Sequence, residues 1–387
     1  MKTGEVFLNC ISAYLTGKHY DPPADCDWDA LLQLCREQKL TAPVYAVVRG
    51  AAANAAQWRM AALTDAAMQA RRGAEFQTLC AELSERGISP LVVKGILCRE
   101  TYPEPDARIS SDEDLYVPRA QYGQFHETML ALGFRAETPD LENAHELRYM
   151  RGSLMVEGHW ELFPQDNTAL NALNALNDGF WQRAGTKDIG GASVRVLDAT
   201  DHMTFLLLHL FKHFINSGAG VRQICDVAQW AKTHAIDWTR VREAMIPARA
   251  GVFAGAVFDA GARYFGMAFP EAFPRADCAA LLADAIGGGI YGTVTMSRKH
   301  SGSMTLAAVE DHEGASRLKS LLRTLFPNRA VMEMSFPWVK KSAALLLPAW
   351  ALRIARYLAA RGKDNAAAES LKIGAERMEL LKQYEIL

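Results

Sequence analysis

The sequence predicts an α+β protein whose mixed β-sheet core is flanked by N-terminal and C-terminal helical regions. Along residues 1–85, apolar residues recur at spacings of three and four, as they do on the buried face of a helix. Between residues 86 and 200, short β-prone runs alternate with amphipathic segments, and beyond residue 200 the helical periodicity returns. We therefore expect an N-terminal helical region at 1–85, an α/β core at 86–200 and a C-terminal helical region at 201–387.

The composition is that of an ordinary globular protein. Half of the 387 residues are hydrophobic, 22% are charged and the formal net charge is −2. This excludes the overall basicity of many nucleic-acid-binding domains, although a local basic groove for RNA stays open. The seven cysteines are scattered without a Cys-x-x-Cys pair, which favours free thiols in a reducing cytosol over a disulfide framework or a zinc knuckle.

We expect a cytoplasmic protein without a membrane span. The N-terminal apolar run is too short for a secretory signal. The longest apolar stretch, 342–355, is interrupted by Pro348 and contains Arg353, so it predicts a buried helix pair.

The positions of the helices and strands are predicted from the hydrophobic periodicity and from the glycine and proline residues that interrupt it. In the N-terminal region, Ala51–Met68 and Met68–Arg86 predict two helices. Four apolar runs predict strands, at Ile88–Val93, Asp114–Val117, Leu154–Phe163 and Ala192–Leu197. Further helices are expected at Ile96–Tyr102, from Pro118 to Gly133, and at His202–Phe214, Val221–Thr233, Trp238–Met245, Ala250–Phe265 and Lys363–Leu387. Gly287–Gly289 and Ser297–Ser303 predict a flexible connection, since the glycines lack the Lys-Ser/Thr of a phosphate-binding P-loop.

The most informative motif is Asp112-Glu-Asp114 at the start of the second predicted strand. Residues i and i+2 of a strand project from the same face, so Asp112 and Asp114 are expected to point at one spot. Two aligned carboxylates repel each other unless a cation lies between them, and such hard oxygen ligands suit Mg²⁺. The pair therefore predicts metal-assisted transfer of a phosphoryl or nucleotidyl group.

The third predicted strand adds a polar face. Glu157, His159 and Glu161 alternate with apolar residues and are expected on one side of the strand. If this strand lies beside the second, Glu157 supplies a third carboxylate to the metal site, whereas a solvated strand face explains the pattern without any function.

Two features near the aspartates suit phosphate. Lys94-Gly95 ends the first predicted strand, where a turn can present backbone N–H groups and glycine permits close approach. Arg108 is expected either to hold a triphosphate or to pair with Asp106 or Asp112. Ser111 is expected beside them in the nucleotide site.

The C-terminal helices carry two further polar pairs. His209 and His213 lie one turn apart on a mostly apolar helix without an acidic third ligand nearby in sequence, so partly buried histidines are favoured over a metal site. They are also candidates for the substrate side of a cleft. Arg222 and Asp226 predict an ion pair within one helix.

Together these residues resemble the uncharacterised nucleotidyltransferase family of the DNA polymerase β-like superfamily. The resemblance covers residues 80–165 well and the downstream helices more loosely. Its motifs are Lys94-Gly95, Tyr102–Arg108, Asp112–Val117, Gly133-Phe134 and Glu157–Trp160, followed by Leu206–His213, Arg222–Asp226 and Ile236–Trp238. The chain departs from the family at Glu113, where an apolar residue is usual, and at Lys94-Gly95, which replaces the Gly-Ser turn of better-known superfamily members.

The resemblance implies a minimal nucleotidyltransferase fold that uses two Mg²⁺ ions and a nucleoside triphosphate, with ATP expected. Asp112, Asp114 and Glu157 would hold the metal; Lys94, Gly95, Arg108 and Ser111 would bind the nucleotide; His159, Glu161, His209 and His213 would line a substrate cleft. The acceptor stays open among a small molecule, RNA and a protein. Two other functions also stay open: a nucleotide-binding or interaction module without catalysis, and a metal-dependent phosphohydrolase.

Overall fold

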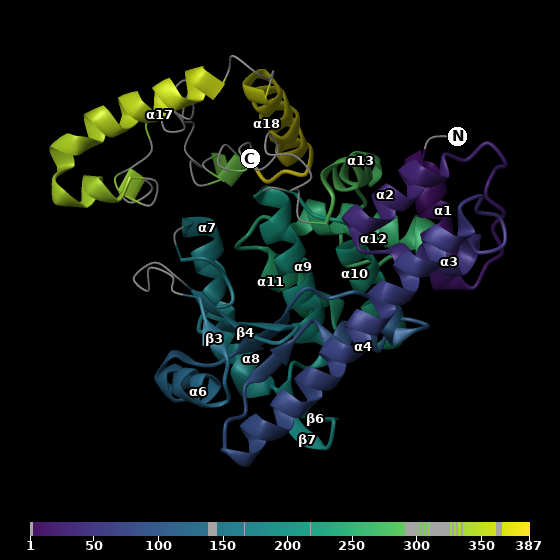
Figure 1. Ribbon diagram of the computed structural model, residues 1–387, viewed down its shortest axis with the longest axis horizontal. Helices are drawn as coiled ribbons and strands as arrows, with labels where there is room; N and C mark the ends of the chain where they lie inside the picture. Colours follow the sequence, from purple (N-terminus) through teal and green to yellow (C-terminus); the bar gives the residue numbers. More distant parts are fainter. Residues whose placement is uncertain are drawn as a thin grey trace.

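The computed structural model describes residues 3–137, 145–165, 167–216, 218–290, 336–360 and 366–387, with scattered positions between 302 and 333. Figure 1 shows the β-sheet in the lower half of the molecule, with the long helix α4 (Ala55–Glu85) running diagonally across it. The N-terminal helix α1 (Thr3–Thr16) contacts α12 (Gly251–Tyr264), so helices that are far apart in the sequence pack together.

The core is one seven-stranded mixed sheet in the order β3-β4-β5-β2-β1-β7-β6. Its strands are β1 (Leu91–Val93), β2 (Glu113–Tyr116), β3 (Arg135–Ala136), β4 (Glu146–Arg151), β5 (Leu154–His159), β6 (Gly185–Ile189) and β7 (Ala192–Val196). β2 lies centrally, antiparallel to β1 and parallel to β5, and β1 is parallel to β7. This confirms the α+β class and the mixed sheet.

The four predicted strands are present, but β5 ends at His159 rather than at Phe163. β4 begins at Glu146, opposite His159, and beyond this point the amides of Trp160 and Glu161 both bond the carbonyl of His145. The ladder therefore stops, and Glu161 leaves the polar face of the strand. β3, β4 and β6 were not predicted, because they carry polar residues on exposed positions and gain their regularity from pairing with a neighbour.

Most helices match the predicted ranges, including α10 (Val221–Thr233) and α11 (Trp238–Met245). The two helices predicted between residues 51 and 86 are one, α4, since the Ala-rich sequence around Met68 contains no breaker. The helix predicted at Ile96–Tyr102 is a single turn, α5 (Ile96–Arg99). The other helices are α2 (Trp28–Gln38), α3 (Thr41–Val48), α6 (Arg119–Ala131), α7 (Thr168–Asn171), α8 (Asn177–Arg183), α9 (Ala199–Ile215), α13 (Ala279–Gly288), α17 (Leu346–Ala360) and α18 (Ala366–Gln383), with 3₁₀ turns η1 (Pro105–Ala107), η2 (Ala172–Leu176), η3 (Pro337–Lys341) and η4 (Ala343–Leu345).

Two predictions in the C-terminal region were wrong. Gly287 and Gly288 belong to the last turn of α13, and only Gly289 leaves the helix, at φ +68°. Pro348 does not separate a helix pair, because it lies in the first turn of α17, where proline is tolerated. Most of Ser297–Ser303 lies outside the described residues. Among the described helices, none has the length and apolarity needed to cross a bilayer.

The unusual Glu113 is explained by the turn between β1 and α5. Its carboxylate accepts the amide N–H of Ile96 at 2.9 Å and pairs with the guanidinium of Arg99 at 3.0 Å. Burial raises the pKa of Glu113, and Arg99 and the Ile96 amide oppose that rise. Gly95 has φ +47°, and a Cβ there would lie 1.9 Å from the Glu113 carboxylate. Glu113 is therefore a buried polar anchor that fixes the Lys94-Gly95 turn.

We predict that Glu113→Leu, which restores the apolar residue usual at this position, lowers the free energy of unfolding by about 3 kcal/mol or more. The cause is Arg99, which is 3% exposed and would lose the carboxylate of Glu113 as its ion-pair partner. Urea unfolding measures the loss. The double variant Arg99→Met/Glu113→Leu should regain part of it, and a loss below about 1 kcal/mol in the single variant would contradict this role for the pair.

Candidate active site

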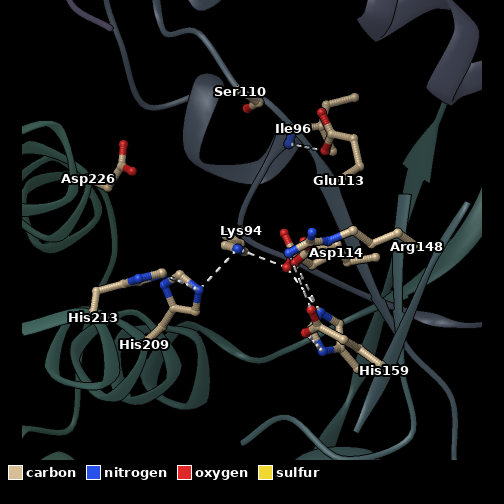
Figure 2. Close-up of polar contacts among 12 residues, drawn as sticks. Lys94, Ile96, Ser110, Glu113, Asp114, Arg148, His159, His209, His213 and Asp226 are labelled. Carbon is tan, nitrogen blue, oxygen red and sulfur yellow. Dashed lines mark hydrogen bonds and ion pairs between the residues drawn. The ribbon is translucent and has the colours of Figure 1, made fainter. Parts of the chain in front are cut away.

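Two of the predicted metal-binding carboxylates lie on adjacent parallel strands. Asp114 of β2 is directly opposite Glu157 of β5 in the sheet register. Residues opposite each other on neighbouring strands project from the same face. One Asp114 oxygen, one Glu157 oxygen and one nitrogen of His159 lie within 4.8 Å of one another. Figure 2 shows Asp114 and His159 facing Lys94 and the histidines of α9.

Asp114 is almost completely buried, but its carboxylate lies beside two nitrogen donors. Its Oδ1 lies 2.8 Å from Lys94 Nζ and 3.1 Å from His159 Nε2. Burial alone would raise the pKa of Asp114, but Lys94 and then His159 lower it below its usual value. The other oxygen, Oδ2, is buried and has no hydrogen-bond partner among the residues that the structure describes. A buried carboxylate oxygen left in this way is suited to a cation.

Glu157 is held by Arg148 of β4, whose Nε donates to the carboxylate at 2.9 Å. Burial, and then the negative charges of Glu146 and Asp114, raise the pKa of Glu157 to about 7. The protein thus concentrates more negative charge here than Arg148 and Lys94 balance. Carboxylate oxygens and an unpaired Asp114 oxygen fit a hard divalent cation such as Mg²⁺.

Asp112 precedes β2 and is only partly buried. It lines the same pocket as Asp114, and its charge contributes to the raised pKa of Glu157. Among the described residues, however, its carboxylate does not belong to a group of three potential ligand atoms that all lie within 4.8 Å of one another. The structure brings Asp112 to the site, while Asp114 and Glu157 form its centre.

The Lys94-Gly95 turn already uses two backbone amides within the protein. The N–H of Lys94 donates to His202 Nε2 at 3.2 Å, and that of Ile96 donates to Glu113. Lys94 itself has φ +46°, a conformation that L residues rarely adopt and that costs about 1 kcal/mol or more. The turn therefore aims the Lys94 ammonium at Asp114, and side chains are better placed than these two amides to meet a phosphate.

Arg108 pairs with neither Asp106 nor Asp112. Its guanidinium makes a bidentate contact with Asp226 of α10, at 3.1 and 2.6 Å, and also bonds the hydroxyl of Ser110. Burial opposes ionisation of Asp226, but Arg108 outweighs it and lowers the pKa of Asp226. The predicted pair of Arg222 with Asp226 was wrong, because Arg222 instead donates to the carbonyl of Ile109 at 2.9 Å.

A pocket lies between β1, β2, α9 and α10. The residues that line it are Lys94, Gly95, Arg108, Asp112, Asp114, Leu206, His209, Arg222, Gln223 and Asp226. His209 is 3.1 Å from the Lys94 ammonium and 3.3 Å from His213. Burial, with Lys94 and Lys212 nearby, lowers the pKa of both histidines, so each ring is neutral at pH 7. Neither belongs to a described group of three potential metal ligands.

Ser111 and Glu161 have other partners. The Ser111 hydroxyl bonds the ammonium of Lys39, which follows α2. Burial and then Arg222 lower the pKa of Lys39 to about 8. Glu161 accepts from the Asn177 side chain at 2.6 Å and does not line the pocket.

Several residues at the site escaped the sequence analysis. Lys39, Arg72 and Arg148 all reach it from helices or from a strand that was not predicted. Each lies far along the chain from the aspartates or in an unremarkable polar segment. The alternation of Glu146 and Arg148 is a local sequence signal for β4, whereas the positive φ of Lys39 is a feature of the structure that the sequence does not show.

A mixed sheet with carboxylates on two adjacent parallel strands, next to a Lys-Gly turn, defines a nucleotidyltransferase-like site. The family model described as uncharacterised nucleotidyltransferase matches residues 24–266, and the chain belongs to this family. The match confirms the resemblance and extends it to the N-terminal helices. No curated protein and no solved structure matches the chain.

We predict that Asp226→Asn lowers the free energy of unfolding at pH 7 by about 3 kcal/mol, because Arg108 would be buried without a countercharge. The lowered pKa of Asp226 sets the sign of the pH dependence. Its contribution is complete above the unfolded-state value of about 3.9 and is lost as the pH falls through the lower folded-state pKa. The difference between wild type and variant should therefore shrink below about pH 4.

Urea titrations at a series of pH values test this, with Asp25→Asn as the matched control. Asp25 is exposed, so its variant should stay within about 0.5 kcal/mol of wild type. A difference for Asp226→Asn that stays constant down to pH 2 would contradict the role of this ion pair.

Proposed function

We propose that the protein is a Mg²⁺-dependent nucleotidyltransferase that moves a nucleoside monophosphate from a nucleoside triphosphate to an acceptor hydroxyl and releases pyrophosphate. The observation that carries this proposal is the opposed pair Asp114 and Glu157, with a buried and unpartnered Asp114 oxygen beside Lys94. Membership of a nucleotidyltransferase family supports the reaction class.

Asp114 and Glu157 would hold the metal, with Asp112 contributing from the pocket wall, and the arrangement is compatible with two ions. Bound Mg²⁺ supplies charge neutralisation and orientation of the phosphates. The residues of this chain then position the acceptor for in-line attack on the α-phosphorus, so that the bond to the pyrophosphate oxygen breaks. Lys94 would offset negative charge that develops on the phosphate oxygens.

The triphosphate, with ATP as the expected donor, would lie along the basic side of the pocket. Arg108 and Arg222 line it together with Lys94 and Gly95, and Lys39 contacts Ser111 at its edge. Within the described part of the chain, Arg222 Nε is buried without a hydrogen-bond partner. Charge-assisted hydrogen bonds from guanidinium groups are strong and directional, which suits phosphate recognition. Side chains would thus do what backbone amides do in a glycine-rich turn.

The acceptor would approach from the side of α9. Neutral His209 accepts from Lys94 and, with His213 behind it, gives the cleft a wall that is polar but uncharged. His159, beside Asp114, would lie on the sheet side of the cleft, whereas Glu161 does not line the pocket. A small molecule, RNA and a protein remain alternative acceptors.

We predict that Asp114→Asn lowers Mg²⁺-dependent release of pyrophosphate from ATP by at least about 100-fold, since it removes a metal ligand and the partner of Lys94. Pyrophosphate is measured with a coupled assay in the presence of a cell extract as the source of acceptor. Asp25→Asn is the matched control and should retain wild-type activity, because it lies on an exposed segment before α2.

The products separate the competing functions. Release of inorganic phosphate instead of pyrophosphate would indicate a phosphohydrolase, and nucleotide binding without any release would indicate a non-catalytic module. Either result would contradict the proposed reaction, as would an Asp114→Asn variant that is as active as wild type.

A further inference from the structure

A second group of potential ligands lies beside the carboxylate pair, at the start of β4. His145, Glu146 and His159 bring two imidazole nitrogens and a carboxylate oxygen together within 4.8 Å. The same oxygen, Glu146 Oε2, lies 3.3 Å from His145 Nε2 and 3.2 Å from His159 Nδ1. This group uses the opposite ring nitrogen of His159 from the one that faces Asp114.

The spacing is that of ligands around one small cation. In tetrahedral zinc sites the bonds to histidine and carboxylate are about 2.0–2.1 Å, which places neighbouring ligand atoms about 3.3 Å apart. Both nitrogens, His145 Nε2 and His159 Nδ1, are buried, and among the described residues neither makes a well-aligned hydrogen bond, although each lies within 3.3 Å of Glu146 Oε2. His159 is 3% exposed, so water does not readily satisfy it. Two buried nitrogens that converge on one carboxylate oxygen without well-aligned hydrogen bonds require an explanation.

The surroundings hold the group in place. Glu146 and His159 are directly opposite each other in the antiparallel β4–β5 ladder, so their side chains share one face. The His145 carbonyl accepts the amides of Trp160 and Glu161 at 3.1 and 3.3 Å, which ties this residue to the end of β5.

His159 also has the outer partner that metal-binding histidines usually have. Its Nε2 lies 3.1 Å from Asp114 Oδ1, so the N–H at that position can donate to a carboxylate. Such a contact fixes the tautomer and turns the lone pair of Nδ1 toward the ligand site. The same ring would link this group to the carboxylates of the catalytic site.

We propose that His145, Glu146 and His159 form a second cation site, selective for a nitrogen-preferring transition metal such as Zn²⁺ over Mg²⁺. Two imidazoles and one carboxylate are a donor set for Zn²⁺ or related ions, whereas Mg²⁺ prefers oxygen ligands. Three protein ligands leave a position on the ion for water or for a substrate group. The competing arrangement has no metal: a doubly protonated His159 held between Asp114 and Glu146, whose charges raise its pKa.

The test is isothermal titration calorimetry. Zn²⁺ is titrated into the chelator-treated full-length protein in a buffer that contains excess Mg²⁺. Wild type should bind Zn²⁺, and His145→Ala and Glu146→Gln should each weaken binding by about tenfold or more. His19→Ala is the matched control, since His19 is 83% exposed in its side chain and lies far along the chain. Circular dichroism checks that each variant is folded.

X-ray absorption of the zinc-loaded wild-type protein keeps the proposal falsifiable even if a variant fails to fold. Two histidine nitrogens and one carboxylate in the coordination shell support the site. Zinc bound through cysteine sulfur, equal affinity in wild type and both variants, or no binding in the presence of Mg²⁺ would each overturn it. Pyrophosphate release with Mg²⁺ is measured separately, so failure of this site leaves the proposed reaction to its own test.

Discussion

The site depends on two adjacent buried carboxylates, Glu113 and Asp114, that project from opposite faces of β2. Each has its own cation: Arg99 for Glu113 and Lys94 for Asp114. Buried charges without partners are too costly to keep, so these pairs fix both the strand and the turn between β1 and α5. The turn between β1 and α5 then sets the direction of the Lys94 side chain. One dipeptide thus couples the fold of the core to the electrostatics of the pocket.

The pocket is completed by elements far from β2 in sequence. Arg72 of α4 donates to the carbonyl of Ser110, and Arg222 of α10 donates to that of Ile109. Lys39 reaches Ser111 from the end of α2. These contacts hold the segment before Asp112, and the residues that make them all lie within the matched range 24–266. The N-terminal helices α2 and α4 therefore help to form the site.

Local patterns predicted the central part of the fold well. β1, β2, β5 and β7 follow from buried apolar runs, and the placement of Glu157 beside Asp114 follows from strand alternation once the two strands are neighbours. β4 and β6 could not be predicted, because their residues are polar and their regularity comes from partners. Partner choice was also beyond sequence reasoning: Arg108 had several plausible carboxylates nearby, and it pairs with Asp226, 118 residues away. The sequence gives no reason for a charged residue at position 113, where an apolar one is usual. The contacts of Glu113 to Arg99 and to the Ile96 amide supply that reason.

The most direct test of the central claim is diffraction from crystals grown with Mn²⁺ and a non-hydrolysable ATP analogue, with data collected for the anomalous signal of manganese. The account predicts an anomalous peak in contact with Asp114 and Glu157, and triphosphate density between that peak and the guanidinium groups of Arg108 and Arg222. Nucleotide bound elsewhere, or no manganese at this carboxylate pair, would contradict it.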